Sequence, residues 1–370
     1  MERFETRQPA VWKGPLAVTS ALLLIGCGAA DRAPNPTVHR PASADHHVHI
    51  RSASAAWFQD SLMSAMGERR PGDTVPSAAV SAADAIAALD SAGVEGALLL
   101  SNAYMFGMPE GRLTDDSTRV RAENDYVAAE AARFPERLVG FCSVHPLKSY
   151  ALREIERCAA DPRIGGLKLH LANSDLDLRD EDQLARLGEV FALADRSRLP
   201  VLIHMRTREP SYGADDARRF VDRVLSRAPD IPVIVAHMAG WGGYDAGTDA
   251  ALGVFVDAIQ AGRLSERVAF GLGAVVFEPR AAGADTARAR AVRDANAKLA
   301  GRIRALGLGR VVFATDWPGW PPGAAPVGKI AANRQLIRDA LPLEPSELDT
   351  VFANVSPIFG WSRAAASDSR

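Results

Sequence analysis

The sequence predicts a (β/α)8 TIM barrel, and three observations support this prediction. From residue 44 onward, short apolar, β-branched runs alternate with longer segments of helical composition, a rhythm typical of parallel βα units. Eight such units fill about 300 residues, the number and size of a closed barrel. Several runs end in histidine or aspartate, and the carboxyl ends of barrel strands carry the chemistry. A doubly wound open sheet is the alternative, but it would not need polar residues at so many strand ends.

The first 43 residues precede the predicted barrel. Residues 1–27 combine a charged start, an apolar core and the tetrapeptide Leu24-Ile25-Gly26-Cys27, which resembles a bacterial lipobox at the end of a signal peptide. A signal peptide cut nearby is the alternative. Residues 28–43 lack a hydrophobic period and are expected to form a flexible tether. We therefore expect an exported protein, anchored to a bacterial membrane by a lipid on Cys27, with its folded domain outside the cytoplasm.

The strands and helices of the barrel are expected at regular intervals over residues 44–361. The strand candidates are residues 45–50, 95–101, 137–144, 164–170, 200–205, 232–238, 267–273 and 310–315. The helix candidates between them are residues 82–92, 119–134, 150–160, 181–197, 215–228, 250–261, 286–306 and 330–340. Residues 57–81 and 103–118 exceed usual βα loop lengths and are expected to cover the mouth. Residues 346–361 are predicted to form a closing helix, and residues 362–370 a disordered tail.

Composition excludes several classes of protein. Among 370 residues, 47% are hydrophobic, so a large core is possible. The net charge of −2 does not indicate the positively charged surface that nucleic-acid binding requires. No apolar run reaches the roughly 18–20 residues of a membrane span. Three cysteines are too few for a disulfide framework. Cys142 and Cys158 are therefore interpreted as buried thiols.

The first predicted strand carries a candidate metal-binding motif. Alternation places Asp45, His47 and His49 on one face and His46 on the other, towards the helices. Two imidazoles two residues apart can bind the same metal ion when further ligands converge on it. An isolated His-x-His motif is weak evidence for a metal site. Whether it binds metal therefore depends on further ligand-type residues at the ends of the later strands.

Four later strands also end in ligand-type residues, namely His170, His204, His237 and Asp316. One such residue would usually be a satisfied core group, but several around one axis indicate a metal or a proton relay. The set that suits one divalent ion with an open position is three neutral imidazoles and a carboxylate, from His47, His49, His204 and Asp316. His237 could then move protons. Asp316 could ligate the ion or act as the base, and sequence does not separate these roles.

These motifs occur in an order that resembles a known family. They are Asp45-x-His47-x-His49, Gly166-Leu167-Lys168-Leu169-His170, His204, His237 and Ala314-Thr315-Asp316-Trp317-Pro318. The set resembles the amidohydrolase superfamily, and most closely its amidohydrolase-related (amidohydrolase 2) branch, which includes decarboxylases, lactonases and hydratases. The resemblance implies one divalent ion, Zn²⁺ or another such as Mn²⁺, bound by His47, His49, His204 and Asp316, with His237 as acid–base. A carboxylated Lys168 bridging two ions, as in binuclear members, is the alternative to a substrate-facing or ion-paired lysine.

The predicted function is metal-dependent hydrolysis of a C–O or C–N bond in a small molecule, such as a lactone, ester or amide, by metal-activated water. The alternative is a lyase that decarboxylates or hydrates an aromatic or unsaturated carboxylate. A ligand-binding lipoprotein without activity is disfavoured, because binding alone needs no water-activating ligand set. No nucleic-acid partner is expected, and a homo-oligomer is left open. The residues expected to contact substrate are Lys168, His170, Trp317 and Arg206, with Arg208 as the alternative arginine clamp.

Overall fold

The computed structural model describes residues 40–67, 78–279, 286–319 and 326–361. The signal peptide, most of the tether and the tail predicted above lie outside these residues. Among the described helices, none is both long enough and apolar enough to cross a membrane.

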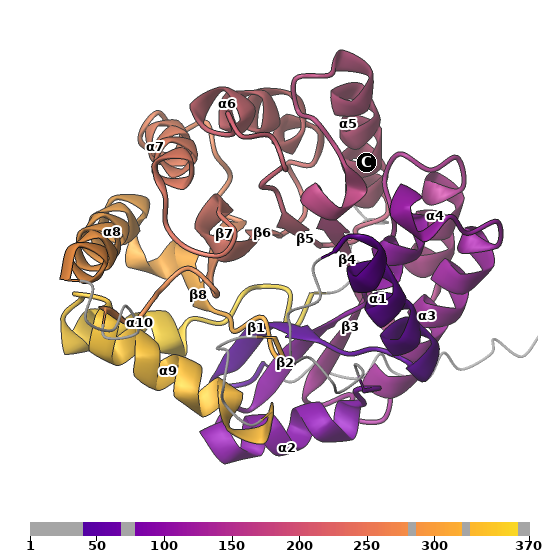
Figure 1. Cartoon of the computed structure of the whole chain (residues 1–370), viewed down its shortest axis with the longest axis horizontal. Coiled ribbons are helices and arrows are strands. Elements are labelled where there is room, and N and C mark those ends of the chain that lie inside the picture. Colours follow the sequence, from indigo (N-terminus) through magenta and orange to yellow (C-terminus); the bar gives the residue numbers. More distant parts are fainter. Residues whose placement is uncertain (1–39, 68–77, 280–285, 320–325, 362–370) are drawn as a thin grey trace, which may run out of the picture. The chain divides into compact units, whose positions relative to one another are not determined.

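Eight parallel strands form one sheet in which each strand pairs with the next along the chain, and helices surround this sheet (Figure 1). The ring closes where Val48 forms a bridge with Trp317 and the His49 amide donates to the Trp317 carbonyl at 2.7 Å. The predicted (β/α)8 TIM barrel is therefore confirmed. The strands are β1 (Ala44–His49), β2 (Gly96–Leu100), β3 (Leu138–Ser143), β4 (Ile164–His170), β5 (Val201–His204), β6 (Val233–Val235), β7 (Val268–Leu272) and β8 (Val311–Phe313).

All eight predicted strands are present, and β6 differs most in length from its prediction. It ends at Val235, and the next residues form a 3-10 turn, η5 (Ala236–Ala239). Within that turn His237, Met238 and Ala239 have φ angles of 54°, 50° and 64°. This left-handed conformation is uncommon for residues with a side chain and cannot continue a strand.

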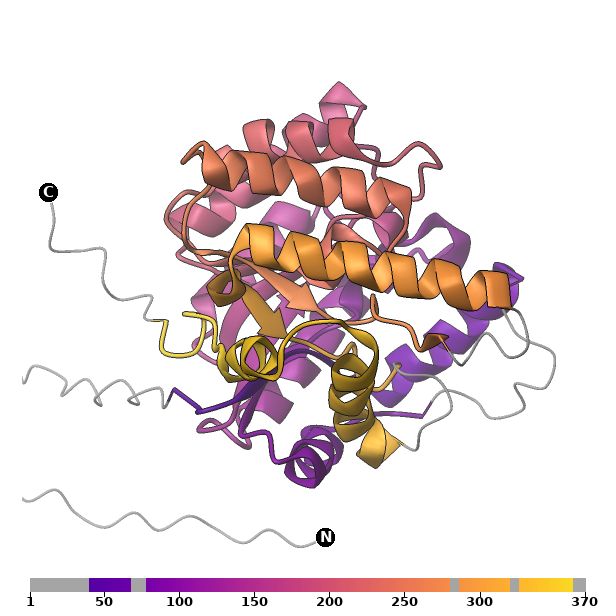
Figure 2. The same ribbon diagram turned by 90° about the vertical axis from the view of Figure 1, so that its left-hand side faces the viewer.

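The helices cover the outside of the sheet, and α7 and α8 run side by side along it (Figure 2). Their bounds are α1 (Ala53–Ala65), α2 (Ala82–Ala92), α3 (Asp116–Ala131), α4 (Ala151–Ala160), α5 (Glu181–Arg196), α6 (Ala214–Arg223), α7 (Ala246–Gln260), α8 (Thr286–Leu306), α9 (Lys329–Ala340) and α10 (Pro345–Ala353). The sequence predicted a closing helix to residue 361, and this was wrong. Helix α10 ends at Ala353, because Pro357 disfavours helical backbone at the residue before it and cannot donate within a helix.

Helix α1 was not predicted as a helix, and its residues from 57 onward were expected only as part of a long mouth segment. Ser52 begins it, since the Ser52 side chain accepts a hydrogen bond from the Ala55 amide. Phe58 and Leu62 are buried on its inner side. The 3-10 turns η1 (Ala103–Gly107) and η2 (Pro109–Gly111) follow β2 and contact α1, so both long segments contribute ordered structure.

Two apolar layers hold the barrel together. The outer layer lies between strands and helices and includes the buried thiols of Cys142 and Cys158, as expected. The inner layer fills the barrel and includes Val355, Ile358 and Phe359. Phe359 lies beside Gly96, the first residue of β2, so the segment after α10 closes the amino end of the barrel. The carboxyl ends of the strands are left for the site.

His46 fastens this closing segment to the barrel. Its Nδ1 lies 2.8 Å from the Phe313 carbonyl, and its Nε2 accepts a hydrogen bond from the Ser356 amide at 3.0 Å. Burial lowers the pKa of His46 to about 4, so the imidazole is neutral. His46 is therefore a structural residue.

Candidate metal centre and active site

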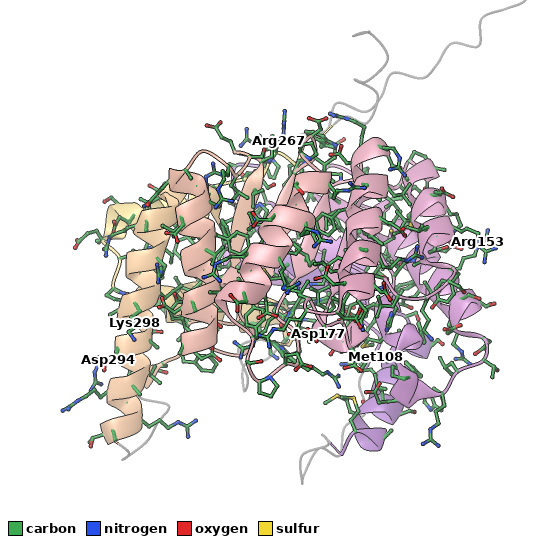
Figure 3. The ribbon with its side chains drawn as sticks, turned by 90° about the horizontal axis from the view of Figure 1, so that it is seen from above. Met108, Arg153, Asp177, Arg267, Asp294 and Lys298 are labelled. Carbon is green, nitrogen blue, oxygen red and sulfur yellow. The ribbon has the colours of Figure 1, made fainter. Side chains whose placement is uncertain are left out.

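A cavity of about 280 Å³ opens at the carboxyl ends of the strands. The strands supply its polar wall, whereas α1 and the segment after β2 supply an apolar wall of Leu62, Met63, Met66, Met105 and Met108. Figure 3 shows Met108 at the end of the barrel where α1 lies, opposite Arg267, which precedes β7. The cavity thus lies where barrel chemistry is expected.

Three potential ligand atoms form a triangle in the polar wall. His47 Nε2 lies 3.0 Å from His49 Nε2 and 3.2 Å from Asp316 Oδ1, and His49 Nε2 lies 3.4 Å from Asp316 Oδ1. A tetrahedral ion with bonds of about 2.0–2.1 Å keeps neighbouring ligand atoms about 3.3 Å apart. The structure therefore brings together three of the four residues predicted as ligands, at the spacing that an ion requires.

Hydrogen bonding alone does not explain the surroundings of His47. Its Nε2 lies within 3.2 Å of His49, Asp316 and the Nζ of Lys168. One imidazole nitrogen carries either a single proton or a single lone pair, so it satisfies one partner and not three. A shared cation removes this conflict, and the donor set of imidazoles and carboxylate suits a divalent transition metal. The residues present therefore fit a metal ion.

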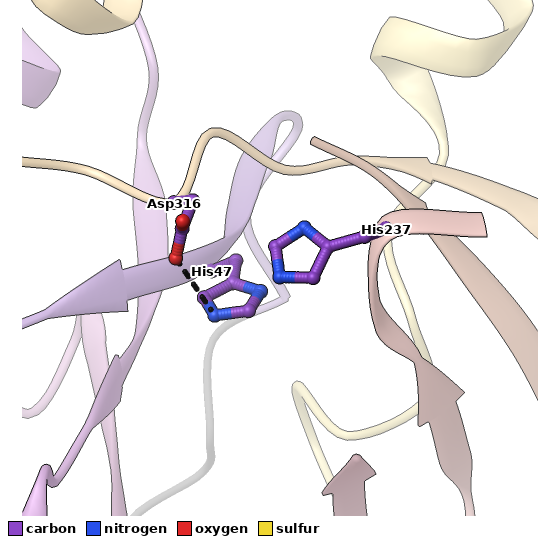
Figure 4. Close-up of side chains that lie close together, drawn as sticks. All are labelled: His47, His237 and Asp316. Carbon is purple, nitrogen blue, oxygen red and sulfur yellow. Dashed lines mark ion pairs between the residues drawn. The ribbon is translucent and has the colours of Figure 1, made fainter. Parts of the chain in front are cut away.

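His237 faces the same cluster from η5. The ligand atoms of His47, His237 and Asp316 all lie within 4.8 Å of one another, and Figure 4 shows the three side chains converging. His237 Nδ1 lies 2.9 Å from the Gly273 carbonyl oxygen, which can only accept. Nδ1 is therefore the donor, and Nε2 is left to hold a ligand or a proton.

His204 lies beside His237 and not within the triangle. The ring centroids of His204 and His237 are 5.0 Å apart, and His204 also stacks on His170 with a centroid distance of 3.9 Å. His204 Nε2 is buried and has no hydrogen-bond partner among the described residues. A buried polar atom of this kind can be satisfied by a partner outside the protein chain, such as water or an ion. Nε2 of His204 is thus free to bind a metal ion, as a fourth ligand would be.

The site keeps its side chains in the protonation states that a metal requires. Burial lowers the pKa values of His47, His170 and His204 well below their ordinary range, so these rings are neutral. Burial raises the pKa of Asp316, but the hydrogen bond with His49 and electrostatic interactions with His237, His49 and Lys168 outweigh it, so the pKa is lowered. Neutral imidazole and ionised carboxylate are the forms that bind metals.

Lys168 lies beneath this cluster. It is fully buried, and burial lowers its pKa to about 7. Its Nζ lies 3.2 Å from His47 Nε2, and the side chain lines the cavity. His170 and Trp317 also line the cavity, so these three predicted substrate contacts face the space that a substrate would occupy.

Arg206 does not reach the cavity, which corrects its placement as a substrate contact. Its guanidinium holds the Asp245 carboxylate through two contacts of 2.8 Å and donates to Thr248 Oγ1 at 2.9 Å. Arg208, two residues later, lines the cavity instead. Arg51, which follows β1, is a second arginine in the wall.

Asp45 also departs from the predicted alternation. Asp45 pairs with Ala97 and Val48 with Leu99, so two residues of β1 stand opposite one residue of β2 between these pairs, and β1 contains a bulge. The Asp45 carboxylate accepts hydrogen bonds from the Thr315 hydroxyl at 2.5 Å and from the amides of Thr315 and His47 at 3.0 Å. Asp45 therefore fastens β1 to the end of β8 and does not join the ligand cluster.

Sequence reasoning missed part of the cavity wall. The Tyr104 ring lies 5.1 Å from the His170 ring, and Trp241 meets His170 and His204 edge-on at 6.0 and 5.4 Å. Trp241 follows η5 and belongs to none of the strand-end motifs. Tyr104 gave no signal because its segment has no periodic pattern.

Comparison with known proteins agrees with this architecture. An amidohydrolase family model (Amidohydro_2) matches residues 44–354, whereas none of the curated proteins matches the chain significantly. A solved 5-carboxyvanillate decarboxylase from Sphingomonas paucimobilis is 20% identical with a TM-score of 0.54, covering 86% of this chain and 99% of its own. A dihydroxybenzoic acid decarboxylase from a Polaromonas species, with bound manganese and 2-nitroresorcinol, is 16% identical with a TM-score of 0.55, covering 86% and 96%.

A third solved structure carries a different activity in its name. It is a probable 2-pyrone-4,6-dicarboxylic acid hydrolase from Acinetobacter baumannii with citric acid bound, 15% identical with a TM-score of 0.52, covering 86% of this chain and 99% of its own. At these identities the likeness of all three structures concerns the fold.

Proposed function

Because this chain belongs to the amidohydrolase family, whose model matches residues 44–354, we propose that it is a metal-dependent lyase that decarboxylates an aromatic or unsaturated carboxylate. The sequence favoured hydrolysis and held the lyase as its alternative. The decarboxylases among the solved relatives support the alternative better. The observation that carries the proposal is a triangle of ligand atoms facing an apolar, aromatic wall with arginines in it.

The proposed residues divide the work between binding and proton transfer. A divalent ion held by His47, His49 and Asp316, with His204 as the fourth ligand, would supply a Lewis acid that polarises substrate oxygens. Decarboxylation breaks the bond between the substrate carbon and its carboxyl carbon and forms a C–H bond there, so one proton must reach that carbon. Nε2 of His237, with Nδ1 held by Gly273, is positioned to accept and release this proton. Tyr104 and Trp241 would hold a planar ring and exclude water.

Hydrolysis of a lactone, ester or amide is the second candidate. The solved hydrolase of a pyrone dicarboxylic acid supports it. His237 and Asp316 could take a proton from water as readily as deliver one to carbon, so the polar wall alone does not separate the two reactions. The apolar wall and the arginines favour the carboxylate lyase.

Product identification tests the choice between them. Metal-loaded protein is incubated with hydroxylated benzoates, unsaturated dicarboxylates, lactones, esters and amides, and carbon dioxide and product masses are measured. Release of carbon dioxide from a carboxylate, with a product lighter by one CO₂, is the expected result. Opening of a lactone with the gain of one water, or cleavage of an ester or amide into two products whose masses together exceed that of the substrate by one water, would replace the lyase by the hydrolase.

The ion is proposed to be manganese in preference to the zinc expected from the sequence. Two solved decarboxylases carry manganese, and the 3.0 Å separation of His47 and His49 suits an octahedral ion as well as a tetrahedral one. Manganese-supported activity exceeding zinc-supported activity is the expected result when each metal is added to metal-free protein.

We also propose export and a lipid on Cys27. The supporting observation is the sequence Leu24-Ile25-Gly26-Cys27 after an apolar run. The catalytic domain would then lie outside the cytoplasm.

A further inference from the structure

The turn that carries His237 has an uncommon backbone. His237, Met238 and Ala239 are consecutive, and all three have left-handed φ angles, of 54°, 50° and 64°. A residue with a Cβ is crowded by its own backbone in this conformation, so each of the three costs free energy relative to glycine. All three residues are buried. Such a run persists only where contacts from the surrounding structure hold it.

The position of the His237 ring depends on this turn. Nδ1 of His237 donates to the Gly273 carbonyl oxygen at 2.9 Å, and Gly273 directly follows β7. The bond sets the tautomer of the ring, but it forms only while the backbone of His237 stays where the turn places it. Nε2, the atom that faces the ligand cluster, therefore keeps its position only if the turn stays left-handed.

Tyr212 holds the other end of the turn. Its hydroxyl donates to the Ala239 carbonyl oxygen at 2.6 Å, in a buried hydrogen bond between residues 27 positions apart. Tyr212 lies between β5 and α6, is 3% exposed and does not line the cavity. It thus connects the turn after β6 to the preceding βα unit. Without this hydroxyl, the Ala239 carbonyl would lose a buried partner.

Arg206 supports the Tyr212 ring. Its guanidinium lies 5.1 Å from the centre of that ring, while Asp245 and Thr248 bind its donors. Asp245 in turn begins α7, because its side chain accepts a hydrogen bond from the Thr248 amide at 2.8 Å. The arginine that does not reach the cavity therefore packs against the residue that holds the turn.

We propose that Tyr212 is a positioning residue for His237. Its hydrogen bond to the Ala239 carbonyl keeps the turn left-handed, and the turn keeps Nε2 of His237 within reach of the metal triangle. Tyr212 acts through His237 and not on the substrate. The inference rests on the proposed function for the role of His237 in proton transfer, but the geometry of the turn does not depend on turnover.

Hydrogen exchange at the His237 ring tests the turn without a substrate. In the full chain, loaded with diamagnetic zinc and containing isotope-labelled histidine, NMR follows the Nδ1–H proton, and His237→Asn identifies its signal. Tyr212→Phe should speed exchange of this proton with water about 10- to 100-fold, the range that follows from leaving one buried carbonyl unpaired. Tyr126→Phe is the matched control. It removes a hydroxyl that donates to the Val80 carbonyl at 3.1 Å, and neither residue lines the cavity, so the exchange rate should stay unchanged.

A glycine at position 239 gives a rescue experiment. Glycine adopts the left-handed conformation readily, so adding Ala239→Gly to Tyr212→Phe should slow the exchange again by roughly 5- to 30-fold. Ala239→Gly alone should slow exchange relative to wild type, which tests the strain of the turn even where Tyr212→Phe does not fold. A merely structural role of Tyr212 would show no such rescue. Unchanged exchange in Tyr212→Phe, an equal increase in Tyr126→Phe, or no effect of Ala239→Gly in either background would overturn the proposal.

Turnover separates the turn from the reaction. With manganese-loaded protein and the carboxylate that gives most carbon dioxide in the product screen, Tyr212→Phe should lower kcat about 10- to 100-fold, because the proton carrier is displaced. KM should stay near the wild-type value, because Tyr212 does not line the cavity. Faster exchange, rescued by glycine, with unchanged kcat would support Tyr212 as the residue that holds the turn and contradict His237 as the proton carrier of the proposed function.

Discussion

The carboxylate of Asp45 holds Thr315 by two hydrogen bonds, one from the hydroxyl at 2.5 Å and one from the amide at 3.0 Å. Both residues are fully buried. The Thr315 hydroxyl in turn accepts from the Trp317 amide at 3.1 Å. This pair therefore fixes the turn that carries Asp316, whose φ of 62° is left-handed, beside the two histidines of β1.

Replacing Thr315 by Val is expected to weaken metal binding about 10- to 100-fold, the usual cost of removing a group that orients a ligand. The variant keeps the shape of the side chain but removes the hydroxyl that Asp45 holds. Thr315→Ser keeps the hydroxyl and should bind metal nearly as wild type. Competition with a chromophoric chelator measures the dissociation constants, and thermal unfolding of metal-free protein reports any general loss of stability. Equal affinities in the two variants would show that the pair does not position Asp316.

Removal of the metal is expected to abolish activity and lower the unfolding temperature. A ligand present at 100 times its dissociation constant stabilises the native state by about 2.7 kcal/mol, which corresponds to several degrees for a domain of this size. Re-addition of manganese should restore both properties. Asp316→Asn serves as control and should show little thermal response to manganese. Activity that survives exhaustive chelation would contradict the metal-dependent mechanism.

Replacing His237 by Asn is expected to lower the turnover rate by roughly 10²–10⁴, the range for a lost acid–base group. Metal content should stay at the wild-type level, because the proposed ligands are intact. His145 offers a matched control, since it is a buried histidine that does not line the cavity, and His145→Asn should keep most of the activity. Elemental analysis measures the metal content of each variant, and steady-state kinetics measures its turnover rate. Loss of the metal from His237→Asn would make His237 a ligand instead.

The lipid anchor gives a prediction of its own. Expression in a bacterium with radioactive fatty acid should label the wild-type protein and spare Cys27→Ser, because the thiol is the acylation site in a lipobox. Cys158→Ser, which changes a buried thiol of the barrel, should remain labelled. Equal labelling of wild type and Cys27→Ser would contradict the prediction of a lipid on Cys27.

The barrel and the ends of its strands could be predicted because each signal is local. An apolar run followed at once by His204 or Asp316 is visible in a few residues, and parallel strands bring such residues to one end. Asp45 was misplaced because the bulge in β1 depends on pairing with β2. Arg206 was misplaced because its partner Asp245 lies 39 residues away, a contact that only the fold creates. Tyr104 and the methionines of the apolar wall come from irregular or weakly patterned segments, which leave no periodic signal.

The central claim is that His47, His49 and Asp316 bind one ion. Anomalous X-ray diffraction at the manganese edge, on crystals of manganese-loaded protein, tests it most directly. The expected result is a single strong peak about 2.1 Å from His47 Nε2, His49 Nε2 and a carboxylate oxygen of Asp316. A peak at another place, or no peak at this triangle with manganese in excess, would contradict the account.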